Sequence, residues 1–284
     1  MRIVLPVLTN AGVVRAPGAR RDELLALADS LSVAFTPDLM VFPELSICGY
    51  PGMVDYPEDA DALALVAEPL PGPTSAAFVA FAAQTGCAVV FGLCELDPAD
   101  GQRYNTVVWA DPGGTATGYR KIHLTGGERQ RHLQPGSDAV VFDTSHGRVG
   151  LSSCYDKMFP QVYQRQRERG AEISVICSAW SSGSGTTGHS GDLLAEQSEL
   201  FDRARAAETG MLVISTNYDG PKLPGGSERF CGGLRVVDGL GRALEPFADT
   251  GAARLWDVDP AGGAASVRAF NGGDFFIRDR RPVR

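Results

Sequence analysis

The sequence predicts a single α/β domain with mixed sheets, spanning residues 1–284. Runs rich in Val, Ile and Phe alternate along the chain with stretches in which apolar residues recur at the helical period. Neither a low-complexity linker nor a repeat of solenoid length divides the 284 residues. The composition, with 44% hydrophobic and 21% charged residues, is that of an ordinary globular protein with a sizeable core.

The expected elements follow one another in a regular order. Strands are expected at 2–8, 39–44, 87–95, 104–110, 116–123, 138–143, 148–153, 173–178, 211–216, 230–238 and 252–258. Helices are expected at 20–35, 73–85, 159–169 and 192–209. In the first helix Leu24, Ala28 and Leu31 form one apolar face, and Pro73 and Pro160 stand near the starts of two others.

The remaining segments are two Gly-rich loops and a tail. The loops, 181–191 and 220–227, join elements and are therefore places where function is common. The tail, 260–284, is polar and Arg-rich and is expected to pack over the surface or onto a partner. The stretch "GSGTTG" at 183–188 satisfies G-x-G-x-x-G, but four residues separate it from the preceding strand. A dinucleotide site requires a tight turn at once, so that interpretation is disfavoured.

Charge and cysteine usage exclude several classes of protein. With 26 basic and 34 acidic residues the net charge is −8, which argues against binding nucleic acid or an anionic membrane. No apolar run approaches the roughly 20 residues that cross a bilayer, and "MRIVLPVLTN" lacks a signal-peptide pattern, so we expect a cytoplasmic protein. The six cysteines show no CxxC pair and no Cys/His cluster, which favours free thiols and no metal.

Two stretches carry candidate acid–base residues. In "MVFPELSICGY", Glu44 stands where an apolar strand ends, and partial desolvation there would raise its pKa toward that of a general base. A helix or turn cap is the alternative role. In "GYRKIHLTGGERQRHLQPG", Lys121 lies within a strand-like run, and Glu128 follows in a Gly-rich loop. Lys121 is one of three lysines, and it is either an exposed edge residue or a cation aimed at a developing oxyanion.

Two further stretches place chemistry at strand ends. In "GRVGLSSCYDKMFPQV", Cys154 stands where a strand turns toward a helix. A thiol close to a helix N-terminus and to a cation loses its proton more readily, although a buried apolar role is the ordinary one for cysteine. In "SVICSAWSSGSGTTGHSG", Trp180 follows another strand and begins a long loop.

Together these stretches resemble the carbon–nitrogen hydrolase family, or nitrilase superfamily. Glu44 in "FPELSICGY", Lys121 in "YRKIHL" and Cys154 in "CYDKMFP" match its Glu–Lys–Cys triad, and Glu128 matches an additional glutamate. Agreement continues in "FGLCE", "YNTVV", "RAAETGMLVISTN" and "DRRP". The resemblance implies an α-β-β-α sandwich that pairs into homodimers or higher homo-oligomers by burying a helical layer, and it implies no cofactor.

Several positions depart from the family's usual pattern. Gln161 stands where glutamate is common, Ser153 where an aliphatic residue usually precedes the cysteine, and Leu234 where serine is usual. Cys177 and Ser178 occupy positions where one proline is frequent. None of these departures falls on the triad, so they bear on pocket shape and dimer packing.

The resemblance also implies a chemistry. A Cys154 thiolate would attack the carbonyl carbon of a small amide, and the thioester would be hydrolysed to an acid while ammonia leaves. Lys121 and the backbone N–H of Tyr155 would hold the oxyanion. The sequence "CYD" is closer to amidases than to nitrilases, so an N-carbamoyl compound ranks second and a nitrile third. Tyr50 and Trp180, with Tyr155, would line the pocket unless they are ordinary core aromatics.

Other interpretations remain open. His123 lies two residues after Lys121, on the same face of the expected strand, and would be the base of a Cys–His hydrolase. A non-catalytic interaction protein with the same fold is a third possibility, against which the intact triad argues. The loop 181–191 is expected to act as a lid over the acyl site.

Overall fold

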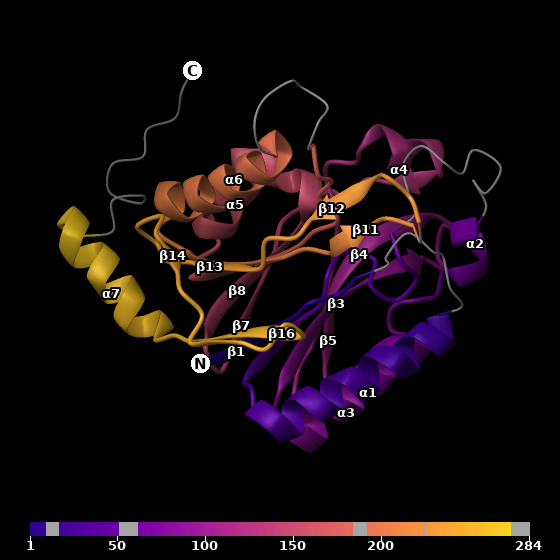
Figure 1. Ribbon diagram of the computed structural model, residues 1–284, viewed down its shortest axis with the longest axis horizontal. Coiled ribbons are helices and arrows are strands. Elements are labelled where there is room, and N and C mark those ends of the chain that lie inside the picture. Colours follow the sequence, from indigo (N-terminus) through magenta and orange to yellow (C-terminus); the bar gives the residue numbers. More distant parts are fainter. Residues whose placement is uncertain (10–16, 51–61, 184–191, 224, 274–284) are drawn as a thin grey trace.

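The computed structural model forms four layers, with a helical layer outside each of two facing sheets (Figure 1). The residues it describes are 1–9, 17–50, 62–183, 192–223 and 225–273. One outer layer contains α1 (Pro17–Phe35) and α3 (Pro73–Thr85), and the other contains α5 (Pro160–Glu168) and α6 (Leu193–Thr209). The predicted α-β-β-α sandwich and the four predicted helices are confirmed.

The first sheet runs in the order β15-β16-β1-β2-β3-β4-β5, with β6 beside β4. Its strands are β1 (Arg2–Pro6), β2 (Leu39–Val41), β3 (Ala88–Leu96), β4 (Arg103–Ala110), β5 (Ala116–Arg120), β6 (Leu133–Gln134), β15 (Ala248–Asp249) and β16 (Ala253–Asp257). The neighbours β1, β2 and β3 are parallel.

The second sheet runs in the order β14-β13-β10-β9-β8-β7, and β11 pairs with β12 separately. Its strands are β7 (Val140–Thr144), β8 (Gly147–Ser153), β9 (Ile173–Cys177), β10 (Leu212–Thr216), β13 (Arg235–Val237) and β14 (Ala243–Leu244). The separate ribbon is β11 (Asp219–Pro221) and β12 (Arg229–Cys231). Here β8, β9 and β10 are parallel, so each sheet directs a group of strand carboxyl ends toward one edge.

The layering follows from strands that are apolar on both faces. In β1, Ile3 and Leu5 pack between the sheets while Val4 packs beneath the helices. In β9, Val175 faces the other sheet while Ile176 packs toward α5 and α6. Alternate residues of a strand point to opposite faces, so continuous apolar runs of this kind fill the space between the sheets and the space under each helical layer.

One expected strand needs correction, and the tail contains a helix that the sequence did not indicate. The single strand expected at 230–238 is two strands, because Gly232 and Gly233 adopt φ values of 66° and 92°, which end β12 and redirect the chain into β13. The tail expected at 260–284 begins as a helix, α7 (Pro260–Asn271), capped by Asp259, whose carboxylate accepts from the backbone N–H of a residue in the first turn.

Three short helices complete the described chain: α2 (Ala62–Val66), α4 (Gly126–Gln130) and the 3₁₀ turn η1 (Cys154–Met158). None of the helices in the described residues is long and apolar enough to span a membrane.

Candidate active site

Glu44 occupies a tight turn directly after β2. Its side chain is fully buried, and the turn continues through Leu45, which has a φ of 47°. The turn lies against β3 at Gly92, where an added Cβ would be 2.2 Å from the backbone nitrogen of Leu45. A glycine at this position lets the two backbones approach, and the approach fixes the place from which the Glu44 carboxylate projects.

Lys121 follows the last residue of β5 and has no exposed surface. Its backbone N–H donates to the carbonyl of Asn105 at 2.8 Å, which continues the pairing between β4 and β5 for one residue. Its Nζ lies 2.7 Å from Glu44 Oε1 and 2.9 Å from each carboxylate oxygen of Glu128. Of the two alternatives for Lys121, the exposed edge residue is wrong, because the structure has a buried cation shared by two carboxylates.

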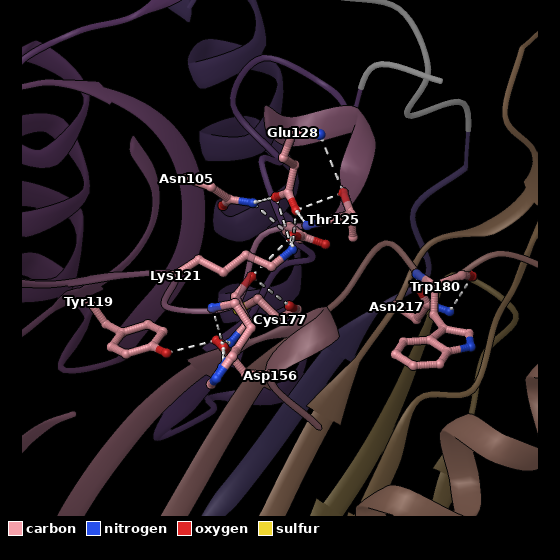
Figure 2. Close-up of polar contacts among 12 residues, drawn as sticks. Asn105, Tyr119, Lys121, Thr125, Glu128, Asp156, Cys177, Trp180 and Asn217 are labelled. Carbon is pink, nitrogen blue, oxygen red and sulfur yellow. Dashed lines mark hydrogen bonds and ion pairs between the residues drawn. The ribbon is translucent and has the colours of Figure 1, made fainter. Parts of the chain in front are cut away.

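Glu128 belongs to the short helix α4, whereas the sequence led us to expect a loop. Thr125 is the N-cap, and its hydroxyl accepts from the Glu128 N–H at 3.3 Å. In return Glu128 Oε2 accepts from the backbone N–H of Thr125 at 2.8 Å and from its hydroxyl at 2.9 Å. This reciprocal capping box was readable from the T-x-x-E spacing, and it aims the carboxylate at Lys121 (Figure 2).

Asn105 bridges the two carboxylates and was not singled out from the sequence. Its side-chain nitrogen donates to Glu44 Oε1 at 2.7 Å and to Glu128 Oε1 at 2.6 Å. Two acceptors on one side fix the orientation of the amide, since only the NH₂ group can donate to both. Figure 2 shows Asn105, Lys121 and Glu128 turned toward one another. The sequence feature that could have identified Asn105 is the presence of an amide inside the apolar strand β4.

Cys154 begins η1 where β8 ends. It is 5% exposed and has a φ of 39°, a left-handed conformation that is unusual for a residue other than glycine. The turn is held from behind by Asp156, whose carboxylate accepts from the backbone N–H of Ser153 at 3.2 Å and from the hydroxyl of Tyr119 at 2.7 Å. The thiol is thus presented on a sharp, anchored turn.

The pKa values of the two carboxylates move in opposite directions. Burial raises the pKa of Glu44, and the charge of Glu128 adds to this, against a partial opposing effect of Lys121. Burial also acts to raise the pKa of Glu128, but the charge of Lys121 and hydrogen bonds from Lys121, Thr125 and Asn105 outweigh it, so that this pKa is lowered. Glu128 is therefore the permanent anion, and Glu44 is the carboxylate prepared to hold a proton.

The lysine and the thiol are both held in their protonated forms. Burial acts to lower the pKa of Lys121, yet the charges of Glu128 and Glu44 raise it well above its usual value. Burial and the charge of Glu44 raise the pKa of the Cys154 thiol well above its usual value, against the opposing charge of Lys121. The raised pKa is the reverse of what the position of Cys154 near a helix start led us to expect, so a base would be needed to remove the thiol proton at neutral pH.

His123, the base of the alternative Cys–His interpretation, is turned toward Asp156. Its Nδ1 lies 2.9 Å from Asp156 Oδ1, and its backbone N–H donates to the same oxygen at 2.9 Å. Its ring stacks on Phe159 with the centroids 3.7 Å apart. These contacts give His123 a part in anchoring the turn, and within the described residues no hydrogen bond joins its ring to Cys154.

Two of the predicted pocket aromatics, Tyr50 and Trp180, are buried. Tyr50 is 5% exposed and packs edge-on against Phe230, and burial, with smaller effects of the Glu128 and Glu44 charges, raises the pKa of its hydroxyl well above its usual value. Trp180 is 8% exposed and lies to one side in Figure 2, where its backbone N–H donates to the side chain of Asn217 at 2.8 Å.

Tyr155 directly follows the thiol and packs edge-on against Phe159. Of the expected lid, residues 184–191 lie outside the described residues. Within the described part of the chain, no group of three His, Cys, Asp or Glu side chains is placed to hold a metal ion.

The fold is an α-β-β-α sandwich in which a buried lysine is shared by two carboxylates, and a buried thiol stands on a sharp turn at the end of β8. The chain belongs to the carbon–nitrogen hydrolase family, whose model matches residues 13–244.

Individual relatives agree with this family. The chain is 31% identical over 236 residues to an (R)-stereoselective amidase of Pseudomonas sp., covering 82% of this chain and 78% of the relative. It is 34% identical over 191 residues to a hydrolase of Mycobacterium tuberculosis, a match that covers 64% of this chain and 61% of the relative. The crystal structure of a carbon–nitrogen hydrolase from Helicobacter pylori superposes with a TM-score of 0.81 at 23% identity, covering 99% and 95% of the two chains, which supports the fold.

Proposed function

We propose that this chain hydrolyses the carbon–nitrogen bond of a small amide, through a thioester on Cys154, to an acid and ammonia. The observation that carries the proposal is the state of Glu44. Its Oε1 is a hydrogen-bond acceptor for buried donors, whereas its Oε2, also buried, finds no hydrogen-bond partner among the described residues. A carboxylate with a raised pKa and one oxygen left over is suited to accept and return a proton.

In the first half of the reaction, Glu44 takes the thiol proton as Cys154 attacks the carbonyl carbon. The carbonyl π electrons move onto oxygen, and the resulting oxyanion is held by Lys121 and by the backbone N–H of Tyr155. Lys121 Nζ has three hydrogens, and its bidentate contact with Glu128 needs only one of them. One N–H therefore remains for the oxyanion while another stays on Glu44.

The first half ends when Glu44 returns the proton to the leaving nitrogen, and ammonia departs as the carbonyl re-forms as a thioester. In the second half, water hydrolyses this thioester. Glu44, again a carboxylate, then removes a proton from water, whose oxygen attacks the thioester carbon. The second tetrahedral intermediate collapses, the acid leaves, and Cys154 recovers its proton from Glu44. One carboxylate serves both halves because each half returns it to its starting charge.

The amide is preferred as substrate on two grounds. The carbonyl oxygen of an amide becomes an oxyanion that the buried Lys121 is placed to stabilise. The Pseudomonas relative, matched over 82% of this chain, is an amidase. An N-carbamoyl compound carries the same carbonyl and is the second candidate, and a nitrile is the third.

The test is ammonia release from a panel of small amides, N-carbamoyl amino acids and nitriles. Wild type is expected to act on amides, Cys154→Ala to release none above background, and the matched control Cys231→Ala to retain turnover. Intact mass after an acid quench should show an acyl adduct in wild type that Cys154→Ala lacks. Hydrolysis by Cys154→Ala would refute the thioester route. Turnover confined to nitriles or to carbamoyl compounds would show that the substrate is of that class and not an amide.

A further inference from the structure

Ser153, the residue before the thiol, makes a contact that the proposed mechanism has not used. Its side chain is fully buried at the end of β8. Its Oγ lies 3.0 Å from Glu44 Oε1 and 3.4 Å from the carbonyl oxygen of Cys177. A hydroxyl has one proton to donate, so the carboxylate and the carbonyl compete for it.

We propose that Ser153 is a positioning residue that fixes the rotation of the Glu44 carboxylate and sets the pH at which Glu44 acts as a base. The proposal rests on the proposed function, because it assigns Ser153 a part in the same proton transfer.

The geometry at Glu44 supports this role. Oε1 accepts from Asn105 Nδ2, Lys121 Nζ and Ser153 Oγ, at distances of 2.7, 2.7 and 3.0 Å. These donors come from separate segments of the chain, and all of them converge on one oxygen. The carboxylate cannot rotate without losing them together, so Oε2 is kept as the oxygen that is available for the proton.

The contact of Ser153 with Glu44 depends on charge. An ionised carboxylate is a much stronger acceptor than a protonated one. When Glu44 is neutral, the Ser153 hydroxyl can turn to the carbonyl of Cys177, which is already within 3.4 Å. The bond with Glu44 therefore stabilises the ionised form, and it lowers a pKa that burial raises.

The alternative is that Ser153 merely fills space at the end of the strand. Ser152 provides a matched control, because it is the adjacent residue of β8, is equally buried, and hydrogen-bonds with the hydroxyl of Tyr163 at 3.1 Å. Successive residues of a strand face opposite ways, so Ser152→Ala removes the same hydroxyl without touching Glu44.

The first experiment is the pH profile of kcat/KM on an amide substrate between about pH 4 and 9. Ser153→Ala should move the acid limb upward by about one pH unit, equivalent to a tenfold change in the ionised fraction of Glu44 at a given pH. Its plateau should stay within a few-fold of wild type, and Ser152→Ala should leave the limb in place. A limb that does not move in Ser153→Ala, or that moves equally in Ser152→Ala, overturns the proposal.

A second experiment does not depend on turnover. The rate of alkylation of Cys154 by iodoacetamide is followed against pH by peptide mapping, with Cys154→Ala as the blank. Ser153→Ala should raise the apparent pKa of this rate by the same amount, because Glu44 must be ionised to take the thiol proton. If no compound in the panel is hydrolysed, the proposed function fails, but the alkylation profile still tests the role of Ser153. Coincident alkylation profiles of wild type and Ser153→Ala would reject that role.

Discussion

Replacing each of the two carboxylates that contact Lys121 by its amide should affect stability to different extents. Glu44 accepts hydrogen bonds through one oxygen, whereas Glu128 accepts through both. Glutamine has one acceptor oxygen and one donor NH₂ group in nearly the same shape. We predict that Glu44→Gln is tolerated by the fold, and that Glu128→Gln destabilises it.

The magnitude for Glu128→Gln follows from its contacts. If the new NH₂ group takes the place of Oε1, it faces donors on Asn105 and Lys121, and if it takes the place of Oε2, it faces Lys121 and Thr125. Either choice sets buried donors against one another, at about 1–3 kcal/mol for each unsatisfied group. A loss of about 3 kcal/mol in the free energy of unfolding is expected, which lowers Tm by roughly 6–12 °C in a chain of this size.

Glu44→Gln avoids this conflict. The glutamine oxygen can take the place of Oε1 and keep its donors, while the NH₂ group takes the place of Oε2, for which the described residues provide no partner. The change also removes one negative charge from a buried cluster of two carboxylates and one ammonium. Stability should stay within about 1 kcal/mol of wild type at neutral pH, while amide hydrolysis is lost.

The pH dependence has a definite sign. The folded pKa of Glu128 is lowered, so the stability it contributes is present above its unfolded pKa and is lost as the pH falls through the folded value. The difference in free energy of unfolding between wild type and Glu128→Gln should therefore become smaller at acidic pH. The folded pKa of Glu44 is raised, so the stability that its protonated form contributes is lost as the pH rises through that value. The free energy of unfolding of Glu44→Gln should therefore increase relative to that of wild type as the pH rises.

Urea unfolding of the three proteins at several pH values measures these differences directly. Ammonia release on the same samples shows whether turnover and stability separate as expected. Equal destabilisation by the two substitutions would refute the assignment of one free oxygen to Glu44. A larger loss of stability in Glu44→Gln than in Glu128→Gln would indicate that Glu44 is the carboxylate that needs both of its oxygens.

Two further predictions concern the supports of the site. Gly92→Ala should abolish soluble folded protein, because an added Cβ would lie 2.2 Å from the backbone that follows Glu44. Expression and circular dichroism measure this, and a folded, active Gly92→Ala would show that this turn can move. Lys157→Met should lower the free energy of unfolding by about 3 kcal/mol, because it removes the buried ammonium 3.0 Å from Asp202. Lys222→Met, whose ion-pair partner is 43% exposed, should lose less than about 1 kcal/mol in the same urea titration, and equal losses would contradict this account.

The site residues that could be predicted from the sequence are those that lie in short, recognisable motifs. Glu44 and Cys154 stand at the ends of strands β2 and β8, where parallel strands of a sheet direct functional groups to one edge. Lys121 and Glu128 lie seven residues apart and meet through a local turn and a capping box. Their meeting with Glu44 was implied by the family resemblance, since nothing in the local pattern fixes the distance between separate strands.

The residues that were missed owe their roles to long-range register. Asn105 meets Glu44 across 61 residues of chain, and Ser153 meets it across 109. A buried amide in a strand, or a serine before a cysteine, has many ordinary explanations until the pairing of sheets and turns is known. Ser153 was noted as a departure that affects pocket shape, and its actual contact is with the proposed base.

The cluster as a whole shows how one buried lysine can support two carboxylates with different tasks. Glu128 receives donors on both oxygens and stays ionised, so it fixes the charge of Lys121. Glu44 receives the same ammonium on one oxygen only, and burial, with a smaller effect of the nearby Glu128 charge, raises its pKa. The difference between a structural anion and the proposed base therefore lies in the distribution of donors over four oxygens. Ser153 adds one donor to the oxygen already occupied, and in the proposed mechanism this donor keeps Glu44 ionised enough to start the reaction.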